Sequence, residues 1–157
     1  MTRVVVWITE GTWAGCVAAA AELAPPGAEL TLLHVTDTDV TEAMHGAIGG
    51  LLGRGGHEPD LARTGRRLVD DALAALGREA ATELRAGEIR HEVVAACADA
   101  DLLVCARDGE HDRLGPRSLG RHTRFVVDHA PCAVLLVWPD RTPGLDSMPS
   151  PPGAKRR

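Results

Sequence analysis

DLLVCARDGEHDRLGPRSLGRHTRFVVDHAPCAVLLVWP, residues 101–139, is the stretch that decides the fold. Two apolar runs, 102–106 and 133–138, enclose a segment rich in glycine and arginine, 107–120, and a short helical pattern, 121–130. Their order predicts a strand, a glycine-rich loop, a helix and a second strand. Backbone amides in such a loop, next to a helix N-terminus, commonly bind an anion such as a phosphate. The stretch therefore predicts both part of a sheet and a candidate ligand site.

Strands and helices alternate along the rest of the chain as well. Unbroken apolar runs are typical of strands that are covered on both faces. The predicted strands are 4–8, 30–35, 80–85, 102–106 and 133–138, and the predicted helices are 13–24, 61–77, 88–98 and 121–130. In the helix over 61–77, one face gathers Leu61, Leu68, Ala72, Ala75 and Leu76. This alternation predicts an α/β fold, a parallel sheet with helices on both faces.

Residues 36–60 give the weakest pattern in the chain. The glycines between Gly46 and Gly56 disfavour a helix, although 40–52 has partly helical spacing. Two interpretations remain open for this region, a mobile flap and a plain long connection. After Pro139 the chain becomes proline-rich and has little apolar content. We therefore expect one domain over 1–139 and a disordered tail over 140–157.

Composition and charge exclude several classes of protein. The chain has 157 residues and a formal net charge of −5, which argues against a nucleic-acid partner. Its four cysteines form no C-x-x-C pair, and the N-terminus lacks the pattern of a signal peptide. No apolar run is long enough to span a membrane. These features predict a cytoplasmic protein with reduced thiols and no membrane partner.

Motifs of nucleophilic catalysis and of two common nucleotide sites are missing. The sequence contains no G-x-S-x-G, no G-x-x-x-x-G-K-[ST] and no G-x-G-x-x-G after the first strand. No catalytic residue is predicted, and a binding protein is favoured over an enzyme. Slow ATP hydrolysis would need Mg²⁺, for which Asp108 and Asp112 are the only nearby acids.

Three segments resemble the universal stress protein family. The strongest match is DHAPCAVLLV, residues 128–137, followed by ADLLV at 100–104 and LLHV at 32–35. The resemblance extends over roughly residues 2–138. It implies a three-layer sandwich with a five-stranded parallel sheet in the order 3-2-1-4-5, an adenine nucleotide alpha hydrolase-like fold. In such a sheet the ligand lies where the strand order reverses, between the first and fourth strands.

The loop after the fourth strand is a degenerate version of the family's ATP-binding motif. Members that bind ATP carry G-x2-G-x9-G-[ST], whereas this chain has Ala106-x2-Gly109-x10-Gly120-Arg121. Two readings of Arg121 remain open: it provides a charge for a phosphate, or it fills the phosphate site. His122 and Thr123 follow it and offer a ring nitrogen and a hydroxyl to the same site.

The resemblance also implies ligand contacts from the first two strands. Glu10 and Gly11, in a Glu-Gly-Thr turn, resemble the family's Asp-Gly-Ser near the adenine or ribose, and Thr9 takes that place in a register shifted by one residue. Val35 matches a position whose backbone contacts adenine in the family. The implied ligand is ATP or another adenine nucleotide, with Mg²⁺ as a companion.

Together these features predict a regulatory binding protein. The resemblance implies a homodimer formed through the last strand, from Ala133 to Trp138, and a regulatory protein partner of unknown identity. The alternative is a dimeric interaction module that binds no nucleotide, in which Arg121 closes the pocket.

Overall fold

The computed structural model describes residues 1–38 and 57–153. The partly helical segment expected over 40–52, with its readings as a flap or a connection, lies outside the described residues. The prediction that 140–157 form a disordered tail stays a prediction.

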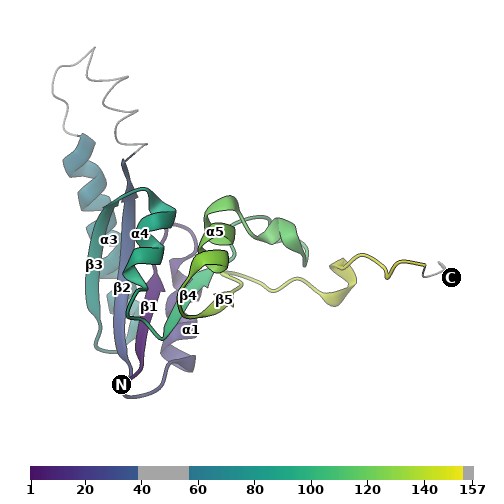
Figure 1. The fold of residues 1–157 in the computed structure, drawn as a ribbon, viewed down its shortest axis with the longest axis horizontal. Coiled ribbons are helices and arrows are strands. Elements are labelled where there is room, and N and C mark those ends of the chain that lie inside the picture. Colours follow the sequence, from purple (N-terminus) through teal and green to yellow (C-terminus); the bar gives the residue numbers. More distant parts are fainter. Residues whose placement is uncertain (39–56, 154–157) are drawn as a thin grey trace, which may run out of the picture.

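A parallel five-stranded sheet forms the centre of the molecule, in the order β3-β2-β1-β4-β5. This confirms the predicted order and the α/β class. The elements are β1 (Arg3–Trp7), α1 (Trp13–Leu23), β2 (Glu29–Asp37), α3 (His57–Leu76), β3 (Ala81–Gly87), α4 (Ile89–Ala96), β4 (Leu102–Ala106), the 3-10 turn η1 (Pro116–Ser118), α5 (Arg121–His129), β5 (Ala133–Val137) and a second 3-10 turn η2 (Leu145–Ser147). In Figure 1, α4 and α5 lie in front of the sheet, and α1 and α3 lie behind it.

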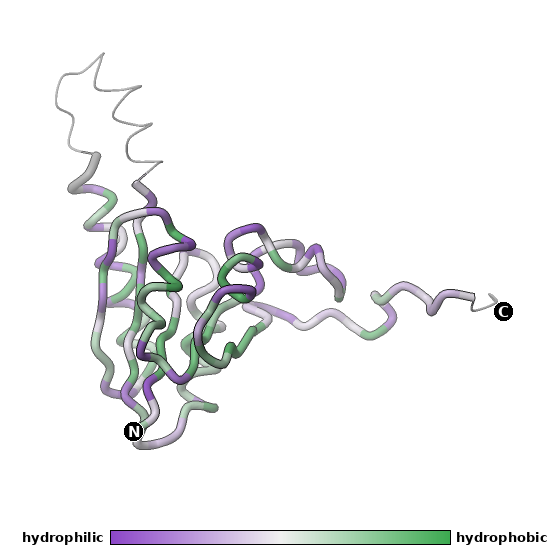
Figure 2. Tube along the Cα trace, viewed as in Figure 1, coloured by the Kyte–Doolittle hydropathy of each residue, from purple (hydrophilic) through white to green (hydrophobic). Residues whose placement is uncertain are grey.

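Two hydrophobic clusters hold the helices to the sheet, one on each face. Val4 and Val6 of β1 pack with α1 and α3, whereas Val5 and Trp7 pack with α4 and α5. Because successive side chains of a strand point to opposite faces, a strand covered on both sides must be apolar at every position. This explains the unbroken apolar runs in the sequence. Figure 2 shows the hydrophobic segments concentrated in the strands at the centre of the domain.

The strand order reverses at β1. Val5 of β1 pairs with Thr31 of β2 on one side and with Leu103 of β4 on the other. The connections after β1 and β4 therefore leave the sheet in opposite directions. In parallel sheets of this kind, a crevice opens at the carboxyl ends of the two strands.

Three details of the sequence prediction were wrong. Helix α3 begins at His57 rather than at Leu61, and Ala75 is exposed, while Val69 is buried against the core. The buried stripe of α3 therefore follows Val69, Ala72 and Leu76. Strand β3 continues to Gly87 rather than ending at Arg85, because its last two residues pair with Thr36 and Asp37 at the end of β2.

The cysteines act as small core residues. Cys16, Cys97 and Cys105 are fully buried, and burial raises the pKa of each thiol to about 12. Cys132 is partly buried, and its pKa is also raised by burial. Since thiolates are the reactive form, these side chains are poor nucleophiles in the folded protein.

Candidate functional site

A cavity of about 210 Å³ lies at the point where the strand order reverses. Its walls come from the carboxyl ends of β1, β2 and β4, from the loops that follow β1 and β4, and from the first residues of α4 and α5. The residues that line it are Trp7, Thr9, Thr12, Val35, Ile89, Ala106, Asp108, His122 and Thr123. The cavity therefore occupies the position that the topology predicts for a ligand.

The inner wall of the cavity is apolar and firmly packed. Trp7 and Val35 are each 5% exposed, and Ala106 is 7% exposed. Ile89, the first residue of α4, is partly buried against the same cluster as Trp7 and Val35. A flat, apolar group would bury its faces here without displacing the strands.

Polar groups surround this apolar wall. The hydroxyls of Thr9 and Thr12 share a short hydrogen bond with each other. Thr123 is 1% exposed, and its Oγ1 lies 3.5 Å from the carbonyl oxygen of Ala106, to which it donates. The Nδ1 of His122 is buried and has no hydrogen-bond partner among the described residues. A buried nitrogen without a partner is unfavourable, but this one is shielded from solvent, so a ligand in the cavity would reach it only if the ring turned.

An internal carboxylate occupies the N-terminus of α5. The backbone N–H of Gly120, the residue before α5, donates to Oδ1 of Asp108 over 2.6 Å. The positive end of the helix dipole and a free amide would otherwise attract an anion at this point. Asp108 therefore takes the place that the sequence suggested for a phosphate.

Several other loop amides are also already used. The N–H of Gly109 donates to Ser118 O over 2.8 Å, and the N–H of Glu110 donates to Arg117 O over 2.9 Å. Arg107 donates its N–H to Val137 O over 2.9 Å. The loop thus folds back on itself and pairs with the η1 turn. Its amides stabilise the loop and do not form an open cradle.

Two arginines in or near the loop use their guanidinium groups to bind other residues of the protein. The guanidinium of Arg107 lies 4.6 Å above the ring of Trp138 and donates to Ser118 Oγ over 2.5 Å. Arg124 donates to the carbonyl oxygen of Pro116 over 2.7 Å. These contacts tie the loop to β5 and α5, away from the cavity.

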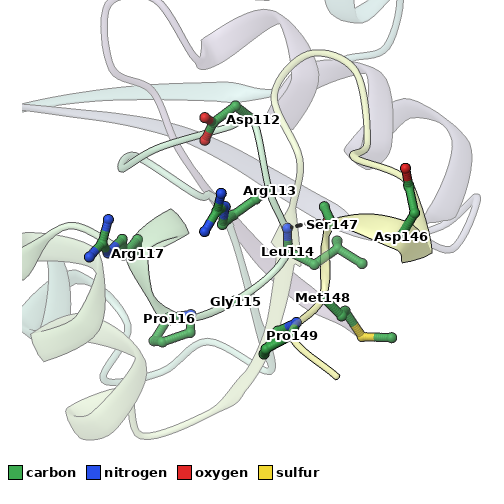
Figure 3. Close-up of a pocket in the computed structure, with 10 residues that line it drawn as sticks. All are labelled: Asp112, Arg113, Leu114, Gly115, Pro116, Arg117, Asp146, Ser147, Met148 and Pro149. Carbon is green, nitrogen blue, oxygen red and sulfur yellow. Dashed lines mark hydrogen bonds between the residues drawn. The ribbon is translucent and has the colours of Figure 1, made fainter. Parts of the chain in front are cut away.

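Arg113 and Arg117 face a second, more open hollow of about 530 Å³. It lies between the loop and the C-terminal segment, and Figure 3 shows Leu114 on one side of it and Met148 on the other. The N–H of Leu114 donates to Ser147 Oγ over 2.9 Å and joins the two sides. Both the loop and the C-terminal segment extend away from the sheet beyond β5 (Figure 1). These arginines are therefore absent from the described lining of the cavity.

The structure brings together only part of the predicted site. Thr9, Val35, Ala106, His122 and Thr123 line the cavity. Five other predicted residues are absent from its described lining: Glu10, Gly11, Gly109, Gly120 and Arg121.

Each of these five has a definite place elsewhere. Glu10 and Gly11 are exposed in the turn after β1, where Gly11 has a φ of 83°. Arg121 is exposed, so its side chain does not close the cavity. Gly109 and Gly120 support the site indirectly, through their hydrogen bonds within the loop.

Trp7 and Ile89 were missed as cavity residues. Trp7 ends a buried strand and Ile89 begins a helix, and both appear in sequence as ordinary core residues. Their places in the sequence could have identified them, because the end of β1 and the start of α4 both lie at the crevice.

Glu88 caps α4 and thereby holds Ile89 at the cavity. Its Oε2 accepts the backbone N–H of His91 over 2.9 Å, and its Oε1 accepts from Arg90 over 2.6 Å. These hydrogen bonds, that from the His91 backbone foremost, lower the pKa of Glu88 to about 2.

Replacing Glu88 with alanine is expected to lower the free energy of unfolding by about 0.5–2 kcal/mol at pH 7, the usual cost of a lost N-cap. Because the folded-state pKa of about 2 lies below the ordinary 4.5, the stabilisation is complete above pH 4.5 and is lost as the pH falls toward 2. Urea unfolding between pH 7 and pH 3 measures this difference. The exposed Glu79→Ala is the control, and a Glu88 effect that does not shrink on acidification would contradict the capping role.

No metal site accompanies the cavity in the part of the chain that the structure describes. Residues 1–38 and 57–153 contain no group of three or more His, Cys, Asp or Glu side chains placed to hold a metal ion. Within the same residues, no helix combines the length and the apolar character needed to cross a membrane.

Solved structures with the same fold come from proteins of similar size. The chain matches the hypothetical protein MJ0577 with a TM-score of 0.69 and 17% identity, over 90% of this chain and 98% of that one. It matches the universal stress protein UspA from Lactobacillus plantarum with a TM-score of 0.55 and 23% identity, over 87% and 97%. It also matches a universal stress protein in complex with cAMP, with a TM-score of 0.56 and 20% identity, over 88% and 98%.

No curated protein shows significant sequence similarity to the chain. The sequence model of the universal stress protein family, however, matches residues 2–137. This match spans every strand of the sheet as well as α5, and it agrees with the fold of the solved structures. The chain therefore belongs to the universal stress protein family.

Proposed function

We propose that this protein is a regulatory binding protein that holds a small adenine-containing ligand in the cavity between β1 and β4. The main support is the lining of the cavity, in which the buried apolar wall of Trp7, Val35 and Ala106 stands next to polar side chains. A second support is the position of the cavity at the reversal of strand order. One structural neighbour is described in complex with cAMP, which contains adenine.

An adenine nucleoside matches the distribution of groups in the cavity. Its base offers flat apolar faces to Trp7, Val35 and Ile89, and its ring nitrogens offer hydrogen bonds to His122. Its ribose hydroxyls find polar partners at Thr9 and Thr12 or at Asp108. The volume of about 210 Å³ lies below the range of roughly 300–1,000 Å³ for drug-sized ligands, which favours a small occupant.

Binding is tested by calorimetric titration of adenosine against wild type and two variants of Ile89. Ile89→Trp extends a larger side chain into the cavity and is expected to weaken binding by about tenfold or more, since 1.4 kcal/mol of lost contact gives a factor of ten. Ile89→Leu conserves volume and is expected to bind like wild type. If the Trp variant binds adenosine with the same affinity as wild type, the ligand must bind at a site other than this cavity.

Absence of heat from wild type would favour the second candidate function, a dimeric interaction module without a ligand. The observation in favour of that candidate is the loop itself, whose amides are already paired within the protein. Arg121 does not close the cavity in that candidate, because its side chain is exposed and absent from the described lining. For the ligand-binding function, the expected output is a change in the surface of the loop and of α5, read by a regulatory protein in the cytoplasm.

The protein is expected to form a homodimer through the open edge of β5. This strand ends the sheet, and β4 is the one described strand with which it pairs. An apolar edge strand is a ready partner for a second copy. Sedimentation equilibrium is expected to give twice the chain mass of 16.6 kDa. A mass of one chain throughout the micromolar range would contradict the dimer.

A further inference from the structure

We propose that Asp108 makes the cavity selective for uncharged ligands, so that it accepts an adenine nucleoside and rejects the corresponding polyphosphate. This inference rests on the proposed function and adds the class of ligand. It differs from the expectation of ATP with Mg²⁺ that the family resemblance implied. Three properties of the described site support it: the group that occupies the start of α5, the charges that line the cavity, and the hydrogen-bonding character of Asp108.

The start of α5 is physically filled. Asp108 Oδ1 accepts the Gly120 N–H over 2.6 Å, and a methyl group added at Gly120 would lie 2.9 Å from the same oxygen. The carboxylate therefore packs directly against the backbone at this point. A phosphate could bind to this amide only after Asp108 had moved away.

The charge of the cavity is unfavourable for a phosphate. Asp108 is the only carboxylate among the described lining residues, and that lining contains no arginine or lysine. Arg107 lies over Trp138, and Arg113 and Arg117 face the other hollow. Asp108 is exposed, so water and salt screen its charge in part, but like charges at close range still repel. A polyphosphate would thus meet a negative charge without a described cation beside it.

Asp108, the one charged group of the described lining, suits a ligand that donates hydrogen bonds. A carboxylate only accepts hydrogen bonds, and a phosphate ester near neutral pH offers acceptors as well. Ribose hydroxyls can donate to Asp108, and they carry no charge. Meanwhile the amides of Gly109 and Glu110, which could have donated to a phosphate, are paired with Ser118 and Arg117. The site therefore matches a nucleoside in both charge and donor pattern.

The test compares adenosine and ATP by calorimetry in the presence of EDTA, so that no divalent cation bridges Asp108 and a phosphate. Wild type is expected to bind adenosine at least about tenfold more tightly than ATP, and Asp108→Asn is expected to reduce this ratio about tenfold or more. Asparagine keeps a carbonyl oxygen for the Gly120 N–H and removes the charge. Glu110→Gln, an exposed carboxylate of the same loop outside the described lining, is the matched control and should leave the ratio unchanged.

Either of two results would overturn the selectivity: wild type binding ATP as tightly as adenosine, or a ratio that Asp108→Asn leaves unchanged. A thermal-shift series with tripolyphosphate separates this inference from the proposed function. If wild type binds neither adenosine nor ATP, the proposed function fails. In that case, stabilisation of Asp108→Asn alone by tripolyphosphate would still support the exclusion of phosphate by Asp108, and equal responses of both proteins would overturn it.

Discussion

Replacing Leu103 with alanine is expected to lower the free energy of unfolding by about 2–5 kcal/mol. Leu103 is fully buried in β4 and packs in the cluster that α4 and α5 cover. It pairs with Val5 on one side and with Val134 on the other. The sheet holds these neighbouring strands in place, so they can fill only part of the cavity that the smaller alanine side chain leaves. A dense interior of this kind makes an alanine cavity costly.

The matched control is Leu84→Ala in the edge strand β3, where the side chain is 40% exposed. The same leucine-to-alanine substitution should lower the free energy of unfolding by well under about 2 kcal/mol there, because the leucine side chain buries far less apolar area at this position. Urea denaturation of both variants provides the comparison. Equal losses of stability at the two positions would contradict the assignment of β4 to the centre of the sheet.

Replacing Gly109 with alanine is expected to separate the loop from the η1 turn and to cost about 1–3 kcal/mol, the range for overpacking. A Cβ at this position would lie 2.2 Å from Arg117 O and 2.8 Å from the carbonyl carbon of Ser118. The clash is with backbone atoms, so no side chain can rotate to relieve it. The hydrogen bonds from Gly109 and Glu110 to the η1 turn would lengthen or break.

Trypsin reports this separation directly, because Arg113 and Arg117 lie in the affected loop. Faster cleavage of Gly109→Ala at these sites is expected, with a matching loss of stability in urea. Gly27→Ala is the control, since a Cβ there meets nothing within 4 Å. Unchanged cleavage of the Gly109 variant would contradict the expected separation of the loop from the η1 turn.

The strands of the sheet could be predicted from the sequence because each strand leaves a local pattern of apolar residues. The unbroken apolar runs of β1 and β4 require two covered faces, and the alternation of strands and helices requires parallel pairing. The ends of elements were less certain. Strand β3 extends to Gly87 through pairing with β2, and such a partnership cannot be seen from one segment alone.

The candidate site was harder to predict because it depends on contacts between distant segments. The resemblance named residues from the loop motif, and it led to the expectation that glycine amides face a ligand. Asp108 accepts the N–H of a residue twelve positions later, and this contact exists only once the loop has folded back. Similarly, Trp7 and Ile89 meet at the cavity only because β1 ends and α4 begins at the same edge of the sheet.

The alternative roles suggested for Arg121 depended on the direction of one side chain. A long charged residue at the first position of a helix can turn toward a ligand or toward solvent, and its sequence position does not distinguish the two. In the structure it is exposed. The charged residue in the described lining of the cavity is Asp108 instead, whose backbone lies just after β4 and whose side chain reaches the start of α5.

The most direct test of the account is a crystal structure of the protein grown with saturating adenosine. We expect the adenine between Trp7, Val35 and Ile89, a hydrogen bond to His122, and Asp108 still bound to the Gly120 N–H. Adenosine bound at another surface, with the space between β1 and β4 unchanged, would contradict the central claim.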